Sequence, residues 1–73
     1  MNLMELRQDI ADRAQAAGSA VKLAKATGVS HSHLSAIIRG DSKPEAKTLN
    51  ALGIRRRLPD KKNKEVWYED ITN

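Results

Sequence analysis

Residues 21–40, VKLAKATGVSHSHLSAIIRG, constrain the fold more than any other stretch, because they have the pattern of two short helices joined by a tight turn. Gly28 is expected to stop the first helix, since glycine adopts the left-handed backbone of a helix end without steric cost. Ser30 is a good N-cap for the second helix. The apolar residues of that helix stand at i, i+3 and i+4 and predict one buried stripe: Leu34, Ile37 and Ile38.

The opposite face of this second helix is short and polar. At about 100° of turn per residue, the positions opposite the stripe are Ser32, Ser35, Ala36 and Arg39. Three of these side chains are small, so the backbone behind them can closely approach another surface. The face therefore suits insertion into a groove better than burial in a core.

The stretch resembles the helix-turn-helix of the phage repressor and Cro-like family, which has the lambda-repressor-like DNA-binding fold. The matching residues are the small residue between the helices, the turn glycine and the core positions: Ala24, Gly28, Val29, Leu34 and Ile37. Residues 38–44 are similar to the family's usual exit from its recognition helix, and the resemblance covers residues 3–54. Two residues depart from the family pattern. Thr27 replaces an apolar residue, and Ala20 replaces a polar residue that often braces the recognition helix.

The expected fold is mainly α, a lambda-repressor-like bundle of four short helices with a possible C-terminal β-hairpin. The predicted helices span residues 3–17, 20–27, 31–39 and 45–52. The apolar residues of the first helix follow a spacing typical of one helix face: Leu3, Leu6, Ile10, Ala14 and Ala17. The inward residues of the fourth helix are expected to be Ala46, Leu49 and Leu52.

The composition changes after residue 54, so we divide the chain into a helix-turn-helix DNA-binding domain, 1–54, and a basic tail, 55–73. The tail begins with three adjacent arginines, and residues 59–64 have the composition of a turn or mobile loop. Residues 65–69 have strand-like character and contain the only Trp and Tyr. We expect a hairpin of Ile54–Leu58 against Val66–Glu69 that serves in dimerisation, with a flexible basic tail as the alternative.

Length and charge limit the function classes. A chain of 73 residues has little interior, so dimerisation would help it, and we expect no ligand-sensing domain and no small-molecule effector. Thirteen Lys and Arg against nine Asp and Glu give a net charge of +4, which favours an anionic partner. No apolar run reaches about 18 residues and no secretory signal is visible, so we expect no membrane partner and a cytoplasmic location.

The sequence lacks the motifs that are typical of enzymes. There is no cysteine, which excludes disulfides and thiolate metal sites, and no HExxH, P-loop or GxSxG motif is present. His31 and His33 would point about 200° apart on a helix, so they cannot grip one metal ion. We therefore expect no enzyme activity, no cofactor and no metal.

The resemblance implies double-stranded DNA as the partner, and each candidate side chain then has a physical role. Ser32 and Ser35 can bond base edges, and Ala36 can touch a thymine methyl group. His31 can donate to a guanine acceptor or to a phosphate, or it can be a solvent-exposed first-turn residue. These residues are the candidates for base readout.

Phosphate contacts are expected around the recognition helix. Arg39 and Lys43 follow its far end, Ser30 begins it, and His33 points sideways, toward either a phosphate or no partner. At the start of the previous helix, free N–H groups near Ser19 suit an anion, and Lys22 could add charge. The arginine run has three open roles: phosphate contacts, pairing with acids across a dimer, or a solvated strand edge.

The combined interpretation is a sequence-specific transcriptional regulator, a Cro-like or repressor-like homodimer that blocks a promoter. Two-fold pairing would place two recognition helices about 34 Å apart on one face of B-DNA. The alternative is an antitoxin that grips a toxin through its tail and autoregulates its operon. An RNA-binding module is disfavoured, because RNA readers usually stack bases on exposed aromatics and only Trp67 and Tyr68 are available.

Overall fold

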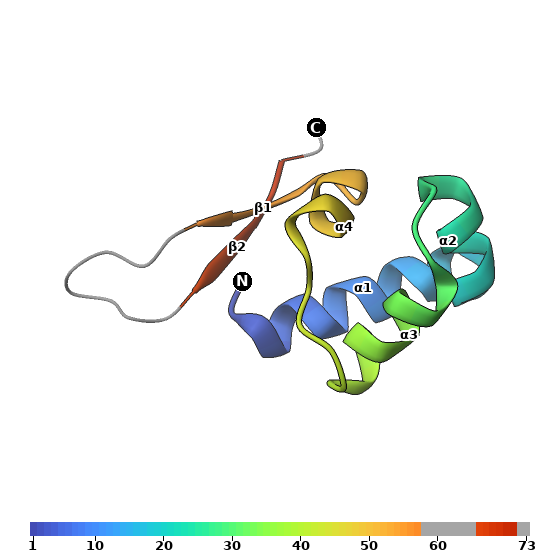
Figure 1. The fold of residues 1–73 in the computed structure, drawn as a ribbon, viewed down its shortest axis with the longest axis horizontal. Helices are drawn as coiled ribbons and strands as arrows, with labels where there is room; N and C mark the ends of the chain where they lie inside the picture. The colour runs from blue at the N-terminus through green and yellow to red at the C-terminus, as the bar shows by residue number, and fades with distance from the viewer. Residues whose placement is uncertain (58–65, 72–73) are drawn as a thin grey trace.

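The computed structural model describes residues 1–57 and 66–71. Within them, four helices precede a two-stranded antiparallel sheet, and Figure 1 shows the hairpin extending from the helical body. The elements are α1 (Leu3–Ala17), α2 (Ala20–Thr27), α3 (His31–Arg39), α4 (Ala46–Ala51), β1 (Ile54–Arg57) and β2 (Trp67–Asp70). The mainly α fold with a C-terminal hairpin is therefore confirmed.

Local capping sets the bounds of the first three helices, which agree with the predicted spans. Ser19 and Ser30 cap α2 and α3, and each hydroxyl oxygen accepts a backbone N–H three residues later. α1 begins with a capping box that the sequence analysis did not identify. The Glu5 N–H donates to Asn2 Oδ1 at 2.8 Å, and the Asn2 N–H donates to Glu5 Oε1 at 3.1 Å.

α4 differs from its prediction in length and in the face that it buries. It spans Ala46–Ala51 rather than 45–52, and Glu45 at its N-cap makes no side-chain capping bond. Ala46 is exposed, so its predicted inward position is wrong, whereas Pro44 and Thr48 are buried. Ala17, the last residue of α1, is likewise exposed, because the helix end extends past the core.

The second strand begins and ends one residue later than predicted, at Trp67–Asp70 rather than 66–69. Ile54 lies opposite Asp70, and Arg57 lies opposite Trp67. The expected strand residue Leu58 and the expected loop 59–64 lie outside the described residues. The far edge of β2 is paired with the start of the chain: the Tyr68 N–H donates to the Met1 carbonyl at 2.7 Å, and the Met1 amino group donates to the Tyr68 carbonyl.

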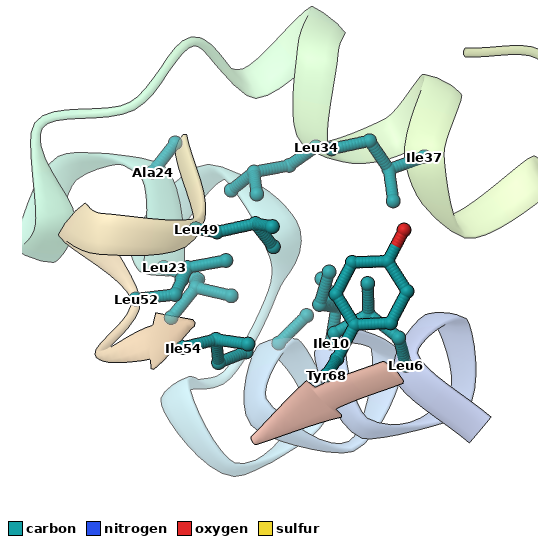
Figure 2. Packing of buried hydrophobic residues seen from close by; sticks show 11 residues of the cluster. Leu6, Ile10, Leu23, Ala24, Leu34, Ile37, Leu49, Leu52, Ile54 and Tyr68 are labelled. Atoms are coloured by element: carbon teal, nitrogen blue, oxygen red, sulfur yellow. The ribbon is translucent and has the colours of Figure 1, made fainter. Parts of the chain in front are cut away.

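The core joins the hairpin to the helices (Figure 2). Leu6 and Ile10 of α1 pack with residues of α2, α3 and α4, and beside them lie Ile54 and Tyr68 from the two strands. Ile54 is fully buried and Tyr68 is 5% exposed, whereas Trp67 is 43% exposed. Tyr68 was not among the expected core residues. The hairpin therefore supplies part of the same core as the helices.

Arg13 ties α1 to the C-terminal elements. Its Nε donates to Asp9 Oδ2 at 2.8 Å, one helical turn away in α1. Its two terminal nitrogens donate to the Leu52 carbonyl at 2.8 Å and to Asp70 Oδ2 at 2.7 Å. One side chain thus fixes the end of α4 and strand β2 against the first helix.

Glu69 is held between two arginines of β1. Arg55 Nη2 donates to Glu69 Oε2 at 3.1 Å, and Arg57 Nη1 donates to Oε1 at 2.8 Å. The hydrogen bond from Arg55, together with the charge of Arg57, holds the pKa of the Glu69 carboxyl below its ordinary value of 4.5. A carboxyl with a lowered native pKa stabilises the fold at neutral pH. That contribution is lost as the pH falls through the native pKa.

We therefore expect Glu69→Gln to weaken the dependence of stability on acid pH. Urea unfolding should show the parent losing more stability than the variant as the pH falls below 4.5, the ordinary value for this carboxyl. Glu45→Gln is the matched control, since Glu45 is exposed and makes no side-chain capping bond. If Glu69→Gln and Glu45→Gln change the acid limb equally, the arginine pair does not hold this carboxylate.

Candidate nucleic-acid interface

α3 presents two different faces, as its sequence predicts. Leu34 and Ile37 are fully buried against the body of the protein. Ile38, the third residue of the predicted stripe, is only partly buried because it lies at the edge of the contact. The other face holds Ser32 and Arg39, which are exposed, and Ser35 and Ala36, which are partly exposed. A polar, small-residue helix face is thus available at the surface.

The turn between α2 and α3 fixes how that face is presented. Gly28 has a left-handed φ of 76°, and the N–H groups of Gly28 and Val29 donate to the Ala24 carbonyl at 2.8 and 3.1 Å. Thr27 is accommodated because its hydroxyl donates to the Leu23 carbonyl at 2.8 Å. Ala20 is partly buried against the core and offers no polar group that could brace α3.

The structure brings four predicted base-reading residues together on the outer side of α3. His31 Nε2 lies 3.3 Å from Ser35 Oγ, one helical turn away, and both groups are at the surface. Ser32 and Ala36 are the adjoining residues of the same helix. His31 and Ser35 can therefore form one hydrogen bond, and the imidazole tautomer decides which of the two side chains donates.

The predicted phosphate contacts at the far end of α3 differ from one another. Arg39 Nε donates to Asp41 Oδ2 at 3.0 Å, and both side chains are mostly exposed. Lys43 is exposed and pairs with no acid within the described residues. A phosphate contact by Arg39 would therefore require its guanidinium to leave Asp41, whereas Lys43 has no such competing acid among the described residues.

Arg7 is a cation at this end of α3 that sequence reasoning missed. A Cβ placed on Gly40 would lie 3.3 Å from Arg7 Cζ and Nη1, so the guanidinium from α1 covers the glycine that ends α3. Arg7 Nε is buried and has no partner in the described part of the chain. No local pattern signals this contact, because it depends on how α1 crosses α3.

At the start of α2, Ser19 and Lys22 are brought together. The Lys22 N–H donates to Ser19 Oγ at 3.1 Å, so this hydroxyl already satisfies one helix-end donor. The Lys22 side chain lies over Gly18, where an added Cβ would come within 2.9 Å of Lys22 Cδ. The charge of Lys22 thus stays close to the N-terminus of α2.

His33 does not share the outer face of α3. Its side chain is partly buried and lines a cavity of about 350 Å³ between α3 and α4, together with Ser30, Glu45 and Lys47. Its Nε2 is buried without a hydrogen-bond partner among residues 1–57 and 66–71. Ser30 is exposed at the rim of the same hollow.

Residues 1–57 and 66–71 contain no group of three histidine or acidic side chains that could hold a metal ion. The part of the chain that the structure describes also contains no helix long and apolar enough to cross a membrane.

The ion pair of Arg39 and Asp41 leads to a prediction about DNA affinity. Asp41→Asn should release Arg39 and remove a negative charge beside the recognition helix. We expect tighter DNA binding and a log–log salt slope steeper by about 0.9, the value for one further phosphate contact. Fluorescence anisotropy across a salt series measures both quantities.

Asp12→Asn is the control, because it changes the net charge equally but lies on α1, where Asp12 accepts from Gln8 at 2.9 Å. It should leave the slope unchanged. Equal slopes for all three proteins would show that the end of α3 does not approach the phosphates.

A family model described as helix-turn-helix matches residues 10–53, which is more than half of the chain. The match begins within α1 and covers α2, α3 and α4, and it ends before the hairpin. Searches of curated proteins and of solved structures found no match to this chain.

Proposed function

Because the chain belongs to the Cro and repressor type of the helix-turn-helix family, whose members are DNA-binding transcription regulators, we propose that it is a homodimeric repressor that recognises one operator and blocks a promoter. The observation that supports this most is the outer face of α3, where small polar side chains remain exposed while Leu34 and Ile37 are buried. Such a face can enter the major groove of DNA.

In this proposal, base readout comes from the outer face of α3. Ser32 and Ser35 bond base edges, His31 donates to a guanine acceptor or to a phosphate, and Ala36 contacts a thymine methyl group. Because Ser35 also lies against His31, one serine contributes to two contacts. We therefore place Ser35 at the centre of discrimination between operators.

Phosphate contacts position the helix in the groove. We assign them to Arg39 and Lys43 after α3, to Ser30 at its start, and to Ser19 and Lys22 at the start of α2. A phosphate contact by His33 also stays a prediction. Its side chain lines the cavity between α3 and α4.

Replacing Ser35 should reduce specificity without unfolding the protein. We expect Ser35→Ala to lower discrimination at one base pair by about 1–3 kcal/mol. Selection of binding sites from random duplexes, followed by competition assays, measures the ratio of specific to non-specific affinity. Gln15→Ala, on the exposed side of α1, is the control. If Ser35→Ala keeps the parental ratio, α3 does not present this residue to the bases.

One edge of β1 pairs with no strand among the described residues, and this edge supports the homodimer. The Ile71 N–H donates to the Gly53 carbonyl at 2.8 Å, and hydrogen-bonded pairs alternate along an antiparallel ladder. Given the register, the backbone groups of Arg55 and Arg57 face β2, whereas those of Ile54 and Arg56 face away from it. We propose that this edge pairs with the same edge of a second copy, which would also protect it from other strands.

Apolar side chains on the hairpin also support the dimer. Trp67 is 43% exposed and Ile71 is 50% exposed, and both are among the large apolar side chains that face solvent. We propose that Trp67 is at the apolar centre of the contact, and that the two recognition helices lie about 34 Å apart. Occupancy of the operator then follows the protein concentration, without a small-molecule effector.

The same exposed residues, Trp67 and Ile71, favour a second candidate function. An antitoxin would use them to grip a toxin rather than a second copy. Sedimentation equilibrium of the purified chain separates the two. A homodimer at micromolar concentration supports the repressor. A chain that stays monomeric until a partner protein is added supports the antitoxin.

A further inference from the structure

A groove of about 500 Å³ lies between the start of α1, the connector that leads into α4, and the hairpin. In Figure 1 the chain start and this connector both lie close to the hairpin. Its lining is mainly apolar and includes Leu3, Met4, Pro44 and Val66. Met4 is 77% exposed, so a large part of this apolar surface faces solvent.

Two cations line the same groove, and no acidic residue does so in the described part of the protein. The first is Lys43, in the connector. The second is Arg56, which differs from its neighbours in β1. Arg55 and Arg57 both donate to Glu69, whereas no described residue pairs with Arg56. Because side chains alternate along a strand, Arg56 lies on the face of the hairpin that carries Ile54 and faces the body.

We propose that this groove docks an acidic, apolar segment of another protein, with aliphatic side chains on the groove floor and carboxylates on Lys43 and Arg56. The two cations indicate that the bound segment is negatively charged, because neither has an acidic partner among the described residues. A guanidinium binds a carboxylate in a bidentate manner. The apolar lining selects against a bare phosphate, because burying Leu3, Met4 and Val66 requires apolar partner atoms. The volume is in the range of sites that hold a few side chains.

Lys43 connects this groove to the proposed DNA face, because it lies in the connector four residues after the end of α3. A docked segment would cover Lys43 and exclude the phosphate that the proposed function assigns to it. This step rests on the proposed function, whereas docking itself does not. The groove is thus a place where an acidic protein segment would release the regulator from DNA.

The test uses the full chain labelled with ¹⁵N and the acetylated, amidated hexapeptide Gly-Glu-Leu-Leu-Glu-Gly. We expect saturable shift changes at Asn2, Leu3, Met4, Lys43 and Tyr68, which line the groove. The glutamine counterpart, Gly-Gln-Leu-Leu-Gln-Gly, should bind at least about tenfold more weakly, because it cannot form either of the charged hydrogen bonds. Absence of saturable shifts at these residues, or equal binding of the two peptides, would overturn the proposal.

Two adjacent arginines supply matched variants. Arg56→Gln should lower the affinity for the acidic peptide about tenfold. Arg55→Gln removes the same charge from the other face of the hairpin and should leave that affinity within about twofold of the parent. Equal losses would mean that only net charge attracts the peptide, and the groove would not be the site. If Arg56→Gln lowers the affinity for DNA and leaves the affinity for the peptide unchanged, Arg56 is a phosphate contact and the proposal is wrong.

The release step has its own measurement. DNA affinity of the parent is first measured without peptide, which tests the proposed function separately. Saturating Gly-Glu-Leu-Leu-Glu-Gly should then lower that affinity, and Gly-Gln-Leu-Leu-Gln-Gly at the same concentration should not. A complex that holds peptide and DNA together at full affinity would overturn the exclusion.

Discussion

Tyr68→Ala should lower the free energy of unfolding by about 3–5 kcal/mol, the usual cost of truncating a buried aromatic side chain. Tyr68 is 5% exposed, and its ring lies beside Leu6 and Ile10 of α1 (Figure 2). A domain of this length has a total stability of about 4–11 kcal/mol, so the variant loses a large share of it. Urea unfolding followed by circular dichroism measures the change.

Trp67→Ala is the matched control, since it removes the neighbouring aromatic from the opposite face of β2. Trp67 is 43% exposed, and we expect its loss to cost the isolated subunit less than about 1 kcal/mol. The two unfolding curves should be compared at concentrations where both variants are monomeric. If the two variants are equally destabilised, the hairpin does not pack on the helices as described.

Arg56→Pro should abolish the homodimer and weaken operator binding by about 100-fold to 10,000-fold, the loss expected when two linked half-sites become one. The proline removes the Arg56 N–H, which faces away from β2 and which we assign to the edge between two copies. Within the described part of one subunit that N–H faces no strand partner, so the fold should survive the change. Sedimentation equilibrium gives the oligomeric state, and anisotropy gives the affinity for the selected duplex.

Arg56→Ala separates the backbone from the side chain, because alanine keeps the N–H and removes the guanidinium. This variant should remain dimeric. Circular dichroism of both variants confirms that the helices are intact. A dimeric Arg56→Pro protein would contradict strand pairing through β1 and would favour a dimer built from helices.

The first three helices were predictable because their signals are local. Apolar spacing identifies α1, and Ser19, Gly28 and Ser30 set the bounds of α2 and α3 through caps and a left-handed turn. α4 was less accurate because Glu45 makes no side-chain capping bond. Without that signal, the start of a six-residue helix is set by how the preceding connector packs, and Pro44 is buried there.

The hairpin was predictable in kind, but β2 begins and ends one residue later than predicted. Trp67 and Tyr68 are adjacent aromatics, and moving the strand by one residue exchanges which of them faces the core. The pairing of Met1 with Tyr68 and the bond from Arg13 to Asp70 hold β2 against the start of the chain and against α1. Both join residues more than 50 positions apart, so no local pattern contains them.

The candidate DNA face was predictable where it depends on helix geometry alone. The division of α3 into buried and exposed residues follows from its apolar spacing, and the structure agrees for Leu34, Ile37 and Ser32. The turn of His33 toward α4 and the contact of Arg7 with Gly40 depend on neighbouring helices. Such contacts require the packed structure.

The central claim is that a two-fold dimer places the outer face of α3 into two successive major grooves of its operator. Hydroxyl-radical footprinting of the DNA that flanks the protein's own reading frame tests this claim most directly. The account predicts a palindromic protected site with half-site centres about 34 Å apart. The Ser35→Ala variant should discriminate less between this site and other DNA. Protection of a single unsymmetrical half-site, or no protection at any protein concentration that saturates selected DNA, would contradict it.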